Sequence, residues 1–465
     1  MFRLAHSIES AVIPTHGTRN FLLRDFVGAA LALMLVVAAF VVPHLGLGSV
    51  TPILDNTTES YKDFSDANPL FGLVDAHLGW GTPIALVVAV AVVMWGPRVA
   101  AALPWRRLVL STWATSAIWA MSLAMIDGWQ RGFAGRLTSR DEYLHEVPGI
   151  TDIPSALAGF SDRILDFQAD SWTTHVSGHP PAAVLTFVWL DRIGLGGGAW
   201  ASALCVAVGS SAAAAVIVAV RALGDETMAR RAAPFLALSP AAIWLAVSAD
   251  ALFAGVAAWG IALLAVAARG SGRRWFLSSV AAGVLLGWGV YLNYGLALMA
   301  VPAVAVLVVS RTARPLIGAS MGALAVAGVF TAYGFWWFDG YFLVQERYYQ
   351  GIASSRPFAY WGWANFASLI CAVGLASAAA LPRVLTWSKL RALSPVNVMA
   401  LAGLLAVIVA DLSALSKAET ERIWLPFQMW ILTAPALLPR QTHRFWLAVQ
   451  ASTALAINHL VLTNW

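Results

Sequence analysis

The chain has 465 residues, of which 59% are apolar and only 11% are charged. Soluble domains carry about 25% charged residues, so this composition excludes a water-soluble globular protein and indicates one that crosses a membrane many times. The net charge of +5 does not indicate nucleic-acid binding, because in a membrane protein the position of the basic residues matters more than their sum. The two cysteines, Cys205 and Cys371, both lie in apolar runs, so no disulfide framework is expected.

The first 25 residues are polar and basic, and the first long apolar run, from Phe26, is predicted to be a retained anchor rather than a cleaved signal peptide. A helix needs about 20 apolar residues to cross the hydrocarbon core. Thirteen runs are predicted to do so: Phe26–Leu45, Gly81–Trp95, Leu108–Ile126, Ala199–Val220, Ala232–Val247, Ala251–Ala267, Phe276–Leu292, Gly295–Val309, Leu316–Trp336, Trp361–Leu381, Val396–Ala410, Ile423–Leu437 and Phe445–Leu462.

The apolar part of Pro180–Ile193 is too short to be assigned as a further span from its sequence alone. If this segment crossed the membrane, the short basic loops after it would face outward, against the positive-inside rule. If it lies in the interface, most of the 29 Lys and Arg residues fall in cytoplasmic segments and most of the 24 acids fall outside. We therefore predict an interfacial or re-entrant helix that begins at Pro180-Pro181, with a cytoplasmic N-terminus.

When the loops are assigned to the two sides of the membrane in this way, five polar segments lie on the outer face. Long loops of compact proteins usually carry function. The five segments are the loop Asp127–His179, the corner Ser239–Leu252, Tyr291–Gly295, Trp336–Pro357 and Ser416–Pro426. The interiors of the helices are nearly free of charge, which argues against ion-coupled transport.

The order of motifs in these segments resembles the C-type glycosyltransferase superfamily (GT-C). The sequence contains Asp-Glu-Tyr at 141–143, His-Pro-Pro at 179–181 and Asp250 after a helix with a Ser-Pro pair. The pattern is similar to the branch that contains protein O-mannosyltransferases and bacterial lipid A aminoarabinose transferases. The resemblance covers about Ile118–Ser310, whereas the first two predicted helices, within 26–95, depart from it. It implies a polyprenyl-phosphate-linked sugar as donor.

Asp141 is the predicted base for the acceptor hydroxyl, since that task needs a carboxylate or imidazole within hydrogen-bond reach. Glu142 is a candidate partner of Asp141 or a metal ligand, and Asp250 is predicted to support Asp141 or orient the acceptor. Helix N-caps would also account for Asp141 and Asp250. No cofactor is required by the sequence; a divalent cation, Mg²⁺ or Mn²⁺, is compatible with Asp141 and His179, but the spacing has no metal-binding pattern.

Arg422 is predicted to hold the lipid phosphate, because a guanidinium matches phosphate with two parallel hydrogen bonds. An interfacial ion pair with Glu419 or Glu421 is the alternative. The other predicted donor-binding residues are His175, His179, Arg347, Lys417 and Trp172, with Arg356 as a rival to Arg422. His179 also has a structural alternative, as the cap of the interfacial helix.

The sequence thus predicts an all-α polytopic membrane protein of about thirteen transmembrane helices, with an extracytoplasmic loop that carries interfacial helices. Its predicted parts are 1–107 (a cytoplasmic segment and two additional helices), 108–310 (a GT-C-like catalytic core with outer loop 127–195) and 311–465 (C-terminal helices with outer loops 336–360 and 413–422). The predicted function is sugar transfer to an envelope glycan, glycolipid or protein at the outer face of the plasma (inner) membrane. A lipid or polysaccharide transporter and a non-catalytic envelope scaffold remain alternatives.

Overall fold

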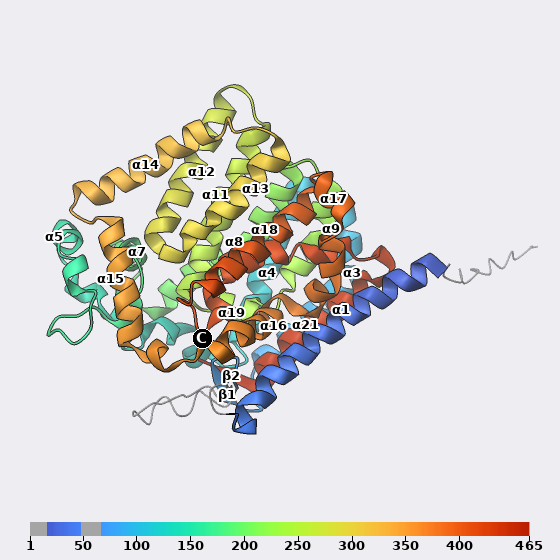
Figure 1. Ribbon diagram of the computed structural model, residues 1–465, viewed down its shortest axis with the longest axis horizontal. Coiled ribbons are helices and arrows are strands. Elements are labelled where there is room, and N and C mark those ends of the chain that lie inside the picture. Colours follow the sequence, from blue (N-terminus) through green and yellow to red (C-terminus); the bar gives the residue numbers. More distant parts are fainter. Residues whose placement is uncertain (1–15, 48–66, 465) are drawn as a thin grey trace, which may run out of the picture.

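The computed structural model describes residues 16–47 and 67–464, and in this part the chain is helical apart from one pair of short strands (Figure 1). The longer helices are α1 (His16–Val41), α3 (Gly81–Ala102), α4 (Trp105–Ala124), α8 (Gly198–Ala222), α11 (Ala249–Arg269), α12 (Gly272–Leu292), α14 (Leu316–Ala332), α16 (Phe358–Val384), α18 (Pro395–Leu412) and α21 (His443–Leu460). The shorter ones are α5 (Ile153–Ala158), α6 (Thr174–Ser177), α7 (Ala182–Arg192), α9 (Glu226–Ala237), α10 (Ala242–Leu245), α13 (Ala300–Ser310), α15 (Trp337–Gln350), α17 (Trp387–Arg391), α19 (Thr420–Ile423) and α20 (Leu425–Ile431).

By length and composition, seven helices in the described part of the chain are able to cross a membrane, or eight if one bent pair is a single span. The seven are Leu23–Leu45, Gly81–Ala102, Gly198–Ala222, Ala249–Arg269, Gly272–Leu292, Phe358–Val384 and Pro395–Leu412. The protein is therefore an all-α polytopic membrane protein, but the predicted number of thirteen spans is not shown. Helices α4 and α21 cover two further predicted spans and are not among the seven, because Ser, Thr and Trp residues and basic groups interrupt their apolar runs.

Other predicted spans are broken rather than continuous. The run Ala232–Val247 forms the end of α9 and the single turn α10, with the break at Ser239-Pro240, where proline cannot donate a backbone hydrogen bond. Side chains bind two of the carbonyls around this break: Trp119 Nε1 donates to Ser239 O at 3.0 Å and Gln450 Nε2 to Phe235 O at 2.8 Å. These bonds allow an irregular backbone to be buried inside the bundle.

The run Leu316–Trp336 ends at Ala332, and the chain then turns by 75° into α15, which gives the bent pair. The run Gly295–Val309 is a 3-10 helix, Tyr294–Met299, followed by α13. The run Ile423–Leu437 is divided among α19, α20 and the 3-10 turn Ala434–Leu437.

Small residues hold the central helices close together. Helix α11 packs against α8 and α12, and α12 against α14. A Cβ atom on Gly255 of α11 would lie 2.2 Å from the carbonyl oxygen of Val208 in α8, and one on Gly283 of α12 would lie 1.9 Å from that of Ala319 in α14. Since apolar burial gives no driving force between helices in lipid, the van der Waals packing that such close backbone contact allows contributes to their association.

The short helices between the spans lie on two opposite sides of the bundle. In Figure 1 the short helices α5 and α7 lie near α15 at the left edge, whereas α17 lies on the opposite side. Helix α7, which begins after Pro181, has 11 residues and is about 16 Å long, too short for a hydrocarbon core of about 30 Å. It does not span by itself, which agrees with its prediction as a non-spanning helix.

Strands β1 (Gly72–Val74) and β2 (Val461–Thr463) pair antiparallel, so the segment before α3 is joined to the C-terminal residues of the described chain. Arg136 at the start of the large loop donates to Thr463 O at 3.1 Å and pairs with Asp127 at 2.9 Å, so the C-terminal strand also anchors this loop. Burial lowers the pKa of Arg136 to about 10, although Asp127 opposes the effect. The division into 1–107, 108–310 and 311–465 stays a prediction, and residues 1–15 and 48–66 of its first part lie outside the described residues.

Candidate functional site

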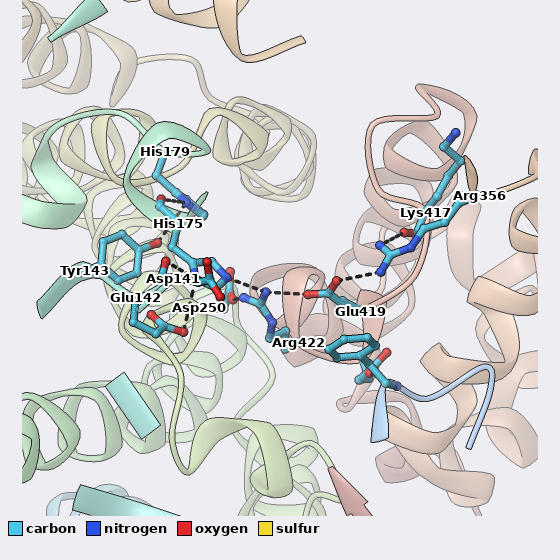
Figure 2. A network of polar contacts seen from close by, with 12 residues as sticks. Asp141, Glu142, Tyr143, His175, His179, Asp250, Arg356, Lys417, Glu419 and Arg422 are labelled. Carbon is cyan, nitrogen blue, oxygen red and sulfur yellow. Dashed lines mark hydrogen bonds and ion pairs between the residues drawn. The ribbon is translucent and has the colours of Figure 1, made fainter. Parts of the chain in front are cut away.

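Arg422 lies at the centre of a buried polar network that joins four distant segments (Figure 2). Its Nη1 donates to Asp250 Oδ2 at 2.5 Å, and its Nη2 donates to Glu419 Oε2 at 2.8 Å and to His175 Nε2 at 3.2 Å. The Arg422 side chain is 7% exposed and that of Asp250 is 2% exposed. Because one guanidinium serves two carboxylates and an imidazole, it fixes the relative position of the large loop, the start of α11 and the segment before α19.

Local capping explains how Asp250 becomes available to Arg422. The N-cap of α11 is Ser248, whose hydroxyl accepts from the backbone N–H of Ala251 at 3.2 Å. Asp250 lies in the first turn of α11, and its carboxylate does not cap the helix, so its alternative interpretation as an N-cap is wrong. The positive end of the helix dipole also favours a carboxylate at this position.

His175 is a neutral imidazole with a defined tautomer. Its Nδ1 lies 2.9 Å from the carbonyl oxygen of Asp141, which can only accept, so Nδ1 carries the proton and Nε2 presents a lone pair to Arg422. Burial, together with the charge of Arg422, lowers the pKa of His175 to about 3. The imidazole is therefore neutral at physiological pH and serves as an acceptor for the guanidinium.

Asp141 and Glu142 are neighbours in sequence but lie in different surroundings. Asp141 is partly exposed in a turn, and the N-cap of the next helical turn, Tyr143–His145, is Glu142, so the alternative that Asp141 caps a helix is wrong. Its Oδ1 accepts from Thr174 Oγ1 at 3.2 Å. Glu142 is 3% exposed, its Oε1 lies 3.4 Å from His175 Nδ1, and its Oε2 has no hydrogen-bond partner among the described residues. Burial raises the pKa of Glu142 to about 8, against the influence of Arg422. At neutral pH Glu142 is therefore mostly protonated, whereas the Asp141 carboxylate is the acid of the pair that solvent and substrate can reach.

His179 and Tyr143 form a second contact beside this pair. His179 Nδ1 lies 2.8 Å from the carbonyl oxygen of His175 and 2.9 Å from the Tyr143 hydroxyl, so a single N–H is shared between both oxygens. Burial lowers the pKa of His179 and raises that of Tyr143. His179 does not cap α7, whose N-cap is Pro181. Its bonds instead hold the two halves of the large loop together.

Glu419 links the Arg422 network to a second group of basic residues. Its Oε1 accepts from Arg356 Nη2 at 3.2 Å, and Arg356 Nη1 donates to Lys417 O at 2.7 Å. Burial disfavours the charged form of Glu419, but Arg422 and Arg356 together lower its pKa to about 2. The Lys417 ammonium lies 5.1 Å from the centre of the Tyr349 ring and makes no ion pair with any described residue. Lys417 is thus the one basic side chain of this group whose charge is not neutralised by a carboxylate of the described residues, so it is the candidate to bind an anionic ligand.

Two of the predicted donor-binding residues are held elsewhere. Trp172 is 2% exposed: its Nε1 donates to Phe160 O at 3.0 Å, and the Arg163 guanidinium lies 3.3 Å from the centre of its ring. One face of the indole is therefore already covered. Arg347 pairs with Asp166 and donates to Ser177 Oγ at 3.2 Å, which ties α15 to α6 rather than to Arg422.

Sequence reasoning did not separate Glu419 from Glu421 as partners of Arg422. Glu419 is the partner; Glu421 turns into the core, where its Oε1 accepts from the Phe71 backbone N–H at 3.0 Å and burial raises its pKa to about 7. The spacing of three residues between Glu419 and Arg422, which suits one turn of helix, is the signal that favours this pairing. Tyr143 was a motif residue without an assigned role, and only its contact with His179 gives it one.

The predicted pair of metal ligands, Asp141 and His179, is not completed by other side chains. No group of three or more His, Cys, Asp or Glu residues that could hold a metal ion occurs in the part of the chain that the structure describes. Among the described residues, Asp141 and His179 therefore lack the further side chains that a metal site made by the protein alone would need.

The fold and this network define a polytopic membrane protein with a buried acid–arginine–histidine centre at one end of its helix bundle. The sequence matches no known protein family model, and it matches no curated protein. Among solved structures the chain is similar to an oligosaccharyltransferase from Archaeoglobus fulgidus, crystallised with zinc and sulfate, at 16% sequence identity and a TM-score of 0.37. The match covers 75% of this chain and 53% of the archaeal protein, so the chain spans about half the length of that relative.

Proposed function

We propose that this protein is a membrane glycosyltransferase that transfers a sugar from a polyprenyl-phosphate carrier to an envelope glycan, glycolipid or protein. The observation that carries the proposal is the meeting of Asp141, His175, Asp250 and Arg422 from three separate segments in one network. These segments contain the motifs that resemble the GT-C superfamily. A scaffold would not need an acid left partly exposed beside a buried, charge-compensated network.

In the proposed reaction the acceptor hydroxyl attacks the anomeric carbon of the donor sugar. A bond forms between the acceptor oxygen and that carbon, the bond from the carbon to the phosphate oxygen breaks, and the electron pair leaves with the polyprenyl phosphate. Asp141 takes the hydroxyl proton, since it is the partly exposed carboxylate of the site. General-base assistance of this kind contributes about 10²–10⁴-fold to the rate.

The contacts of Arg422 favour a positioning role over the predicted direct bond to phosphate. Both of its terminal nitrogens already donate to carboxylates, Nη1 to Asp250 and Nη2 to Glu419. In this proposal Arg422 orients Asp250 and keeps His175 neutral. The leaving phosphate is stabilised instead by Lys417, with Arg356 beside it, because the Lys417 ammonium has no carboxylate partner among the described residues.

The membrane is proposed to be the plasma (inner) membrane, with the site on its outer side. Support comes from the positive-inside rule, which assigns the basic loops of the other end to the cytoplasm. Labelling of single introduced cysteines at positions 152 and 273, on opposite ends of the bundle, with an impermeant thiol reagent tests this orientation. Only position 152 should react in intact cells, and labelling of position 273 alone would reverse the topology.

The test of function is complementation of a deletion strain with Asp141→Asn, followed by profiling of lipid-linked sugars and envelope glycans. The matched control is Asp152→Asn, which removes an exposed acid from the same loop. We expect Asp141→Asn to lose the transferred sugar and accumulate the lipid-linked donor, with an unchanged melting temperature, whereas Asp152→Asn restores the glycan. Full restoration of the glycan by Asp141→Asn would refute the proposed role of this residue.

A further inference from the structure

A cavity of about 440 Å³ lies at the end of the bundle opposite to the candidate site. Its lining includes Trp105, Arg221, Arg269, Ser271 and Arg274. Asp250 and Arg269 stand at the two ends of α11, and the 21 residues of this helix place them about 28 Å apart. This separation matches the hydrocarbon thickness of about 30 Å, so the cavity lies at the other membrane interface.

The three arginines of the cavity carry more charge than nearby acids neutralise. Arg221 shares Glu226 with Arg230, through bonds of 2.8 Å and 2.7 Å. Arg269 and Arg274 are exposed and form no ion pair with the described residues; Arg269 donates only to the carbonyl oxygen of Leu223, at 3.2 Å. The cavity therefore presents two guanidinium groups whose charge is not compensated.

The lower wall of the cavity is apolar and belongs to spanning helices. Val218 precedes Arg221 by three residues on α8, and Val266 precedes Arg269 by three residues on α11, so each valine lies one turn deeper on the same face as its arginine. Trp105 forms the side, with the Arg221 guanidinium 4.3 Å from its ring centre. The cavity thus has charged groups at its rim, an aromatic ring at the level of the interface and aliphatic groups deeper in the membrane. This order matches that of the headgroup and the acyl chains of a phospholipid.

The start of α12 adds to the attraction for an anion. Gly270 and Ser271 line the cavity immediately before this helix of 21 residues, so its N-terminal backbone N–H groups and the positive end of its dipole lie beside Arg274. Basic pockets between transmembrane helices at the cytoplasmic surface are known to bind anionic lipid headgroups.

We propose that this cavity is a binding site for one anionic phospholipid, with its phosphate against Arg269 and Arg274 and an acyl chain along Val218 and Val266. The site is separate from the sugar-transfer centre, and the inference does not depend on the proposed function.

The test uses native mass spectrometry of the full chain in detergent, titrated with phosphatidylglycerol or phosphatidylcholine. The variant is Arg274→Gln, since this exposed side chain forms no ion pair with the described residues. The matched control is Arg273→Gln, which removes the same charge from the adjacent position outside the cavity. Arg269→Gln is a second variant, and size-exclusion profiles show whether each protein is folded.

We expect the wild type to bind phosphatidylglycerol more tightly than phosphatidylcholine, and Arg274→Gln to weaken phosphatidylglycerol binding about fivefold. Arg273→Gln should change it by less than about twofold, because this side chain does not line the cavity and salt screens the attraction between exposed charges. Equal effects of Arg273→Gln and Arg274→Gln would indicate only diffuse surface attraction and overturn the proposal. Displacement of phosphatidylglycerol by millimolar inorganic phosphate would also overturn it, because the ligand would then be a free anion.

Discussion

Replacing Arg422 by glutamine is expected to lower the free energy of unfolding by about 3–5 kcal/mol at pH 7, because it leaves buried carboxylates without their cation. The Asp250 side chain is 2% exposed and that of Glu419 is 16% exposed, so water compensates for little of the lost interaction. The lowered pKa of Glu419 gives a second estimate of the free energy that these ion pairs contribute. Its fall from 4.5 to about 2 corresponds to about 3 kcal/mol, although part of this comes from Arg356.

The pH dependence follows from the lowered pKa of Glu419. Its ion pairs stabilise the folded protein fully above pH 4.5, and this stabilisation is lost as the pH falls towards about 2. In Arg422→Gln the ion pair between Glu419 and Arg422 is missing, so the variant loses less stability than the wild type when the pH falls. The difference between the wild type and Arg422→Gln should therefore be largest near pH 7 and shrink between about pH 5 and pH 2.

The measurement is reversible unfolding in mixed micelles with increasing SDS, with Arg273→Gln as an exposed control that removes the same charge. Adding Asp250→Asn to Arg422→Gln should recover part of the loss, since much of the cost is an unpaired buried carboxylate rather than a missing contact. If Arg422→Gln unfolds like Arg273→Gln at pH 7, or its deficit is independent of pH, the account of this network is wrong.

Three further outcomes are expected. Gly283→Ala should destabilise the fold by about 2–3 kcal/mol, since its Cβ would lie 1.9 Å from a backbone oxygen in α14. Gly328→Ala is the control and should be neutral, because a Cβ there would have nothing within 4 Å. Equal melting temperatures of the two variants would contradict the packing argument. As the pH rises from 5 to 8, the Glu142→Gln protein should become more stable than the wild type by about 2 kcal/mol or more. The reason is that burial raises the pKa of Glu142 to about 8, so the folded wild type loses stability over that range. Parallel plots of unfolding free energy against pH for the two proteins would refute this. Lys417→Gln should raise the KM for the lipid-linked donor about tenfold with little change in melting temperature, and an unchanged KM would remove Lys417 from the phosphate site.

Much of the candidate site was predictable because membrane topology limits where polar residues can lie. The basic loops and the short Pro-Pro helix predict that Asp141, His175, Asp250 and Arg422 share one side, and the structure brings these four together. Their pairing was not predictable. The contact between Asp250 and Arg422 joins residues 172 positions apart, and no local spacing encodes such a distance.

Burial decided the remaining assignments. Asp141 and Glu142 are adjacent carboxylates with the same local chemistry, yet one is partly exposed and the other is 3% exposed with a raised pKa. Trp172 was predicted to bind the donor, but the Arg163 guanidinium covers one face of its ring, which its sequence position does not indicate. Desolvation depends on neighbours from every packed segment, so it cannot be read from the residues on either side.

The sequence by itself determined that the chain is a polytopic membrane protein, because hydropathy acts through local composition, and the distribution of Lys and Arg predicts that most of its acids lie on one side. Only the tertiary structure decided which apolar runs are continuous helices, since the breaks at Ser239-Pro240 and after Ala332 depend on contacts that satisfy or redirect the backbone. It likewise decided that Arg422 is held by Asp250 and Glu419 while Lys417 keeps its charge, because ion pairing in a buried site depends on distances between segments that the chain order does not fix.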